Sequence, residues 1–162
     1  MIRELQHAYE SGVKFKLHVF GKANASTKRF NYGFPINFLP PFRVSERSAA
    51  FSIFDILICP SVLDNSPNVV CEAFSEGVPV IGQSGTGIDS YITDCDNGYL
   101  HDFKSYRAEP YCLGRKLDSV VASYSEFSRA AKMTAKFELS YETIGGQYLR
   151  LYRSTFPDRV VC

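Results

Sequence analysis

The chain has 162 residues, of which 45% are hydrophobic and 14% aromatic, and it carries 18 Lys and Arg against 17 Asp and Glu. This composition predicts one folded globular domain and excludes a disordered or collagen-like chain. Because the formal net charge is only +1 and no run of basic residues forms a stripe, we do not expect nucleic acid as a partner.

Membrane, secretory and metal-binding classes are disfavoured as well. No apolar stretch approaches the ~20 residues that a membrane span needs, and the first residues lack the basic-then-apolar layout of a signal peptide. The 5 cysteines are odd in number, no two of them have metal-site spacing, and the histidines are scattered. We therefore expect neither a disulfide framework nor a metal site, and a reducing compartment.

The first third of the chain predicts alternating helices and strands. Residues 2–12 place apolar side chains on one helical face and predict a helix. Residues 14–21 predict a strand that enters a core. Residues 22–33 have neither helical nor strand period and predict a loop. A second strand follows over residues 36–39, and Ser45 opens a short helix.

Two continuous apolar runs, residues 55–60 and 78–82, are typical of strands that are buried on both faces. We predict that residues 56–59 and 78–81 within these runs form adjacent, parallel and nearly fully buried strands. Between them, Ser66 and Pro67 supply a cap and a first-turn proline, and Gly77 marks the end of the helix.

The last third predicts helices alone. The alternation before it predicts an α/β, Rossmann-like, doubly wound and mostly parallel sheet, closed by a helical C-terminal tail. We expect a single domain over residues 1–162, with the sheet region over about 1–102 and the tail over about 108–156. Apolar residues recur at helical spacing over residues 110–124, 125–137 and 141–152.

The richest candidate site is the segment 61–76, because ligands of parallel sheets bind beyond the carboxyl ends of strands. The backbone N–H groups of Asn68 and Val69, at the start of the predicted helix, suit a phosphate. Asp64 and Glu72 bracket them and would accept hydrogen bonds from hydroxyls of a sugar or ribose. The segment therefore indicates a nucleotide sugar as ligand.

The same residues also fit a purely structural role, in which Ser66 caps the helix, Asp64 solvates a turn and Glu72 lies on an outer face. Spacing alone does not decide between the two. His101 and Asp102 would form a catalytic dyad only if a nucleophile lay nearby, and we do not favour this interpretation.

A linked series of motifs then resembles a known family. Residues 55–61 (DILICPS), 67–73 (PNVVCEA) and 77–81 (GVPVI) are similar to the group-1 glycosyltransferases, also called glycosyltransferase family 4. The family's pair of glutamates, separated by seven intervening residues, has Asp64 at its first position and Glu72 at its second. Residues 136–153 resemble the family's closing helix.

The resemblance implies a GT-B enzyme with two facing Rossmann-like domains, of which this chain looks like the carboxy-terminal, donor-binding half. It implies catalytic or donor contacts from Asp64 to the transferred sugar and from Glu72 to the ribose. It further implies substrate-binding roles for Asn65 and Ser66 at the sugar, Asn68 and Val69 at the phosphate, and Leu39 and Pro40 at the base.

On this resemblance we expect a retaining hexosyltransferase that uses a nucleotide sugar as donor, a glycan or lipid-linked molecule as acceptor, and no metal or cofactor. It would serve polysaccharide or glycolipid assembly in the cytoplasm, with peripheral contact at the inner face of the membrane left open. Two alternatives stay open: a non-catalytic nucleotide-binding module or truncated relic, and part of a GT-B sugar-nucleotide epimerase.

Two departures from the family qualify this expectation. The family's donor domain begins one strand earlier, on a segment whose Arg and Lys neutralise the diphosphate, and the acceptor half precedes it. We therefore expect a domain truncated at its N-terminus, an acceptor bound through a missing N-terminal domain, and no sugar transfer by this chain alone.

Overall fold

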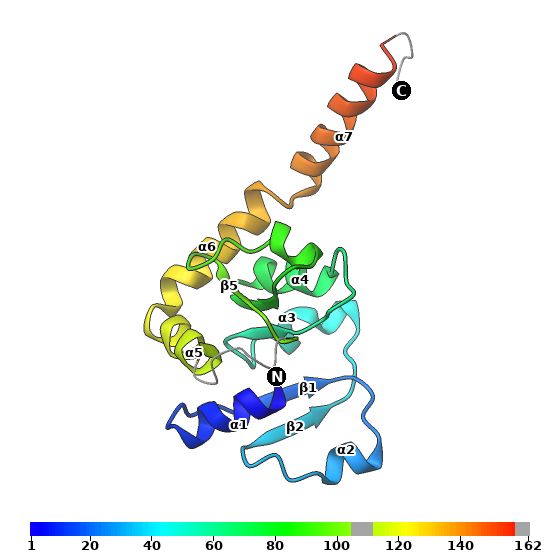
Figure 1. The fold of residues 1–162 in the computed structure, drawn as a ribbon. Coiled ribbons are helices and arrows are strands. Elements are labelled where there is room, and N and C mark those ends of the chain that lie inside the picture. Colours follow the sequence, from blue (N-terminus) through cyan, green and yellow to red (C-terminus); the bar gives the residue numbers. More distant parts are fainter. Residues whose placement is uncertain (105–111, 158–162) are drawn as a thin grey trace.

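The structure, a computed structural model, describes residues 1–104 and 112–157. Two parallel β-sheets with helices on both faces form the body, and the last helix extends away from it (Figure 1). The first sheet pairs β1 (Leu17–Phe20) with β2 (Ile36–Leu39), and the second has the order β3 (Leu57–Cys59), β4 (Val80–Gln83), β5 (Gly98–His101). This architecture confirms the predicted α/β, Rossmann-like fold class.

The helices connect the strands and then form the tail. They are α1 (Ile2–Glu10), α2 (Ala25–Arg29), α3 (Arg47–Phe51), α4 (Asn68–Glu76), α5 (Cys112–Ala122), α6 (Tyr124–Phe137) and α7 (Tyr141–Thr155), with short 3-10 turns η1 (Val44–Glu46) and η2 (Gly87–Ser90). Of the described helices, none is both long and apolar enough to cross a membrane.

The core lies on the two faces of the second sheet, because successive side chains of a strand point to opposite faces. Ile81 packs in a cluster with Leu5 of α1 and Leu113 of α5. Its neighbour Val80 packs in another cluster, which contains Phe74 of α4. Every residue of β4 is therefore buried, between one helical layer and another.

The predicted neighbours, residues 56–59 and 78–81, are adjacent and parallel, with Leu57 opposite Val80. The full burial of the second run is confirmed, but that of the first is wrong. Leu57 and Ile58 are half-buried, because β3 is the outer strand of its sheet and pairs with β4 alone. An edge strand lacks the neighbour that would cover its outer side.

Two elements escaped prediction. The expected loop over residues 22–33 contains α2, whose N-cap Asn24 accepts a hydrogen bond at 2.8 Å from the Thr27 N–H. Strand β5 is a run of four residues, too short to show a period. The first residues of the predicted helix 110–124 lie outside the described residues, and its described part is α5.

Helix α7 differs from the rest of the tail. Helices α5 and α6 contain fully buried residues, such as Leu113 and Ala131. Helix α7 contains no buried residue, and Tyr148 and Leu151 on it are 58% and 61% exposed. The helical tail thus packs on the sheet only up to the end of α6 (Figure 1).

Candidate functional site

The segment between β3 and α4 leaves the carboxyl end of the second sheet, as predicted. Within it, the Ser66 N–H donates to Asp64 Oδ1 at 3.1 Å, so the aspartate closes a turn on its own backbone. Asp64 is half-buried, and its second oxygen has no hydrogen-bond partner among the described residues. One carboxylate oxygen is therefore held and the other is open to a ligand.

The start of α4 differs from the prediction in one detail. Pro67, not Ser66, occupies the N-cap position, and no side chain caps the helix. The Ser66 hydroxyl instead lies 2.6 Å from the hydroxyl of Tyr91. A serine at the residue before the cap is one position too early to reach the first-turn N–H groups.

The uncapped helix start exposes two backbone donors. The first turn is closed by the Val70 N–H, which donates to the Pro67 carbonyl at 3.0 Å. The N–H groups of Asn68 and Val69 have no acceptor within the described part of the chain. Two unused donors at the positive end of a helix dipole form a suitable site for an anion.

Glu72 lies one helical turn beyond Asn68, on the same side of α4. It is half-buried, and its carboxylate forms neither a hydrogen bond nor an ion pair with any described residue. In the chain, Asp64 precedes the two open N–H groups and Glu72 follows them by one helical turn.

The remaining predicted residues divide between the two sheets. Asn65 lies in the same loop, and its carbonyl packs so closely on Gly87 that a Cβ atom there would not fit. Leu39 ends β2 in the other sheet, where its carbonyl accepts from the Gly21 N–H at 3.1 Å, and Pro40 follows it, exposed. No hydrogen bond between described residues joins Leu39 or Pro40 to the segment 64–72.

The two cysteines near this segment differ in burial: Cys59 lies in the core, and Cys71 is half-buried. Burial raises the pKa of the Cys59 thiol, and the nearby Asp64 carboxylate acts in the same direction. Burial likewise raises the pKa of Cys71. Both thiols therefore stay protonated near neutral pH, which does not suit a nucleophile.

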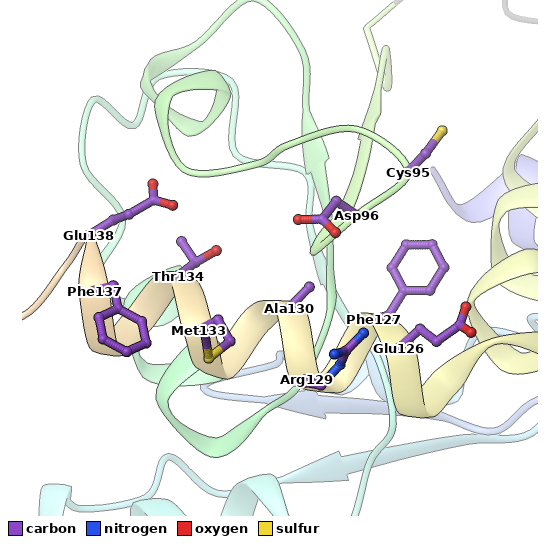
Figure 2. Close-up of a pocket in the computed structure, with 10 residues that line it drawn as sticks. All are labelled: Cys95, Asp96, Glu126, Phe127, Arg129, Ala130, Met133, Thr134, Phe137 and Glu138. Atoms are coloured by element: carbon purple, nitrogen blue, oxygen red, sulfur yellow. The ribbon is translucent and has the colours of Figure 1, made fainter.

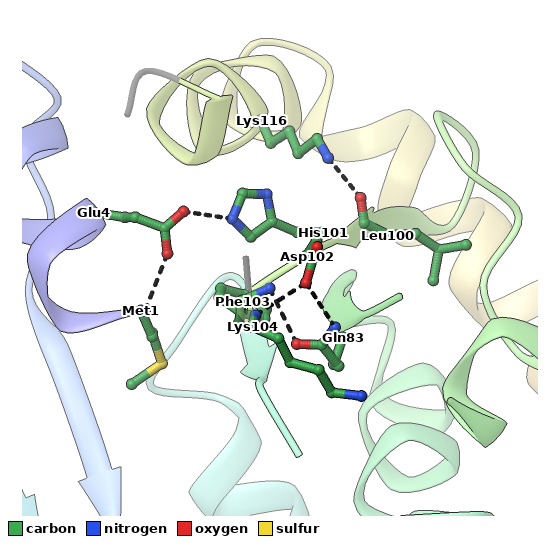
Figure 3. A network of polar contacts seen from close by, with 9 residues as sticks. All are labelled: Met1, Glu4, Gln83, Leu100, His101, Asp102, Phe103, Lys104 and Lys116. Carbon is green, nitrogen blue, oxygen red and sulfur yellow. Dashed lines mark hydrogen bonds and ion pairs between the residues drawn. The ribbon is translucent and has the colours of Figure 1, made fainter. Parts of the chain in front are cut away.

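Sequence reasoning missed a polar network at the carboxyl ends of β4 and β5 (Figure 3). His101 is buried, with Nε2 2.7 Å from Glu4 Oε1 of α1. The fully buried Gln83 donates to the Asp102 carboxylate at 3.3 Å and accepts from the Phe103 N–H at 3.0 Å. His101 thus pairs with a carboxylate of α1, and its geometry is that of a link between α1 and the sheet.

A hollow of about 530 Å³ lies elsewhere, between the loop at Cys95 and one side of α6 (Figure 2). None of the predicted site residues lines it. Its charged lining consists of Asp96, Glu126 and Glu138 against Arg129, a balance that disfavours a diphosphate. Over residues 1–104 and 112–157, no three His, Cys, Asp or Glu side chains gather as a metal site.

Comparison with known proteins gives a consistent result. The family model described as "Glycosyl transferases group 1" matches residues 1–109. No curated protein sequence matches the chain. The similarity is therefore clearest at the level of the family and of solved structures.

Three solved structures illustrate the likeness. A sucrose-phosphate synthase from Thermosynechococcus elongatus is 17% identical, with a TM-score of 0.74 over 98% of this chain and 43% of its own. HepE from Anabaena, in complex with UDP-glucose, is 15% identical, with a TM-score of 0.69 over 94% of this chain and 44% of its own. The C-terminal domain of a group 1 family glycosyl transferase from Francisella tularensis is 18% identical, with a TM-score of 0.66 over 86% of this chain and 79% of its own. The chain thus spans less than half the length of the first two and most of the isolated C-terminal domain.

Proposed function

Because the chain belongs to the group 1 glycosyl transferases, we propose that it is the donor-binding part of a glycosyltransferase and holds a nucleotide sugar at the start of α4. The observation that carries the proposal is the pair of open N–H groups at Asn68 and Val69, preceded in the chain by the carboxylate of Asp64 and followed by that of Glu72, each with an unengaged oxygen. An anion and several hydroxyl groups on one ligand match this arrangement.

The assignment of ligand parts follows the resemblance to the family, and the charges of the groups agree with it. The diphosphate would accept hydrogen bonds from Asn68 and Val69, since a helix N-terminus attracts negative charge. Glu72 would accept from the ribose hydroxyls, and Asp64 from the transferred sugar, with the backbone of Asn65 and Ser66 beside it. Leu39 and Pro40 would contact the base from the end of β2.

The finer properties of the reaction belong to the same proposal. We propose a hexose-type sugar, a retaining transfer without a metal, and a nucleotide sugar such as the UDP-glucose bound by HepE. The acceptor, a glycan or lipid-linked molecule, would lie on polypeptide outside residues 1–162, because the chain spans 43% of the first structural neighbour. We expect this assembly in the cytoplasm, where it can meet a lipid-linked acceptor at the inner face of the membrane.

Calorimetric titration of the chain with UDP, GDP and UDP-glucose tests the proposal. At least one of these should bind, and Glu72→Ala should weaken binding by about 1–3 kcal/mol, as expected for hydrogen bonds to a charged group. Glu126→Ala, which alters the hollow along α6, is the matched control and should leave the affinity unchanged. Absence of binding, or equal affinity of the Glu72 variant, would overturn the proposal.

A further inference from the structure

The loop that precedes α4 is fixed by the segment that follows β4. The hydroxyl oxygens of Ser66 and Tyr91 lie 2.6 Å apart, a hydrogen bond in which either group can donate. On the same side, Gly87 of η2 packs directly against the backbone carbonyl of Asn65. The loop is thus held by one hydrogen bond and by one close backbone contact.

Tyr91 is itself anchored in the interior. Its carbonyl accepts a hydrogen bond at 3.1 Å from Nδ2 of Asn97, a fully buried side chain. Asn97 also donates to Thr134 of α6 at 3.0 Å and accepts from the Thr93 N–H at 2.9 Å. The ring of Tyr91 packs against the apolar cluster around Phe74. Its hydroxyl group is therefore presented to Ser66 from a well-fixed position.

The contact extends to the carboxylate that we assign to the sugar. The Ser66 N–H donates to Asp64 Oδ1 at 3.1 Å, so Ser66 is joined to Tyr91 through its hydroxyl and to Asp64 through its backbone. Glu72 lies outside these contacts, because it is placed by helix α4. A change at Tyr91 should consequently reach Asp64 and leave Glu72 in place.

We propose that Tyr91 is a positioning residue that sets the orientation of the Asp64 carboxylate and thereby the affinity for the sugar part of the donor, not for its nucleotide. The inference rests on the proposed function of the 64–72 segment. Tyr91 does not touch the ligand, and its effect passes through Ser66 to Asp64. Loss of its hydroxyl should therefore change the preference for nucleotide sugar over bare nucleotide.

The test compares the affinities of the chain for UDP-glucose and for UDP. Tyr91→Phe should weaken UDP-glucose about 3- to 10-fold, the range of one hydrogen bond, and change UDP less than about 2-fold. Asp64→Ala should likewise weaken the affinity for UDP-glucose more than that for UDP. Tyr99→Phe is the matched control, because its hydroxyl also pairs with a serine, Ser119, at 2.8 Å on α5; it should leave both affinities unchanged.

A double variant separates positioning from general loosening. If Tyr91 acts through Ser66, Tyr91→Phe should add no further loss of UDP-glucose affinity to Ser66→Ala. Equal losses for UDP and UDP-glucose, or losses that add, would overturn the inference while the proposed function stands. Failure of the unchanged chain to bind either compound would overturn both. Should Tyr91→Phe fail to unfold cooperatively, Ser66→Ala alone gives the same comparison of the two ligands.

Discussion

The two sheets of the molecule are built from similar runs of residues but are buried to different extents. In β4 all four residues are buried, although they include Gly82 and Gln83. In β1 and β2 every residue is only half-buried, although Val19, Phe20 and Phe38 are large and apolar. Strand β4 has a neighbour on each side, whereas β1 and β2 have one each. The number of neighbours, more than the composition of the strand, sets the burial.

The same difference separates the two parts of the proposed donor site. The residues assigned to phosphate, ribose and sugar follow β3, beside the buried β4, in a loop held by Gly87 and Tyr91. The residues assigned to the base follow β2, and Pro40 is exposed. We therefore expect the second sheet to dominate both stability and ligand affinity.

The largest expected effect concerns stability and uses one residue type in both sheets. Ile81→Ala, in the centre of β4, should lower the free energy of unfolding by about 2–5 kcal/mol, because it leaves a cavity in the core. Ile36→Ala, on the half-buried β2, should cost about 1 kcal/mol, since its surroundings can relax toward solvent. Urea unfolding measures both, and equal losses would contradict the comparison.

A second variant removes one of the two open N–H donors at the start of α4. Asn68→Pro deletes one N–H at the first position of α4, where proline is favoured, and the preceding Pro67 already has an extended backbone with ψ 108°. Affinity for UDP should fall by about 1.5–3 kcal/mol, the range for a hydrogen bond to a charged group. Thermal unfolding should stay unchanged. Retained affinity would show that this N–H does not contact phosphate.

The corresponding change at the first sheet should be smaller. Leu39→Ala, at the end of β2, would remove part of the proposed apolar contact with the base and should weaken UDP and GDP by less than about 1 kcal/mol. The two losses should differ, because the two bases present different surfaces to the end of the strand. A loss as large as that of Asn68→Pro would show that the first sheet, not the second, provides most of the nucleotide affinity.

The smallest effect reports on the electrostatics beside β3. The pKa of Cys59 is raised above 9.0, first by burial and also by the Asp64 carboxylate. Because burial keeps the thiol protonated, the folded state holds this proton more tightly than the unfolded chain does. The stability from the buried thiol is therefore complete below the unfolded-state pKa and is lost as pH rises through the folded-state pKa. Asp64→Asn should lower the pKa of Cys59 and speed its alkylation by iodoacetamide above about pH 9. An unchanged rate would place the carboxylate away from the thiol.

Local signals in the sequence account for much of this fold and site. The end of α4 was predictable because Gly77 has φ +77°, a left-handed conformation that glycine adopts without strain. The sequence places Asp64 before the start of α4 and Glu72 one turn after it, and their role at a ligand stays a prediction. The half-buried state of β3 was not, because strand order is a property of the sheet and not of one run of residues.

The contacts that fix the loop were also beyond sequence reasoning. Ser66 has the residue type of a helix cap and lies next to the helix, so local propensity alone favours the wrong partner. Its true partner, Tyr91, is 25 residues away and reaches it only because β3 and β4 are neighbours.

The most direct test of the central claim is to locate the nucleotide on the molecule by NMR. In a titration of the ¹⁵N-labelled chain with UDP-glucose, the account predicts the largest amide shifts at Asn68 and Val69, followed by residues 64–66. Amides that line the hollow on α6, such as those of Arg129 and Met133, should not move. The largest shifts at Arg129 and Met133, with Asn68 and Val69 unchanged, would contradict the assignment of the donor site to the start of α4.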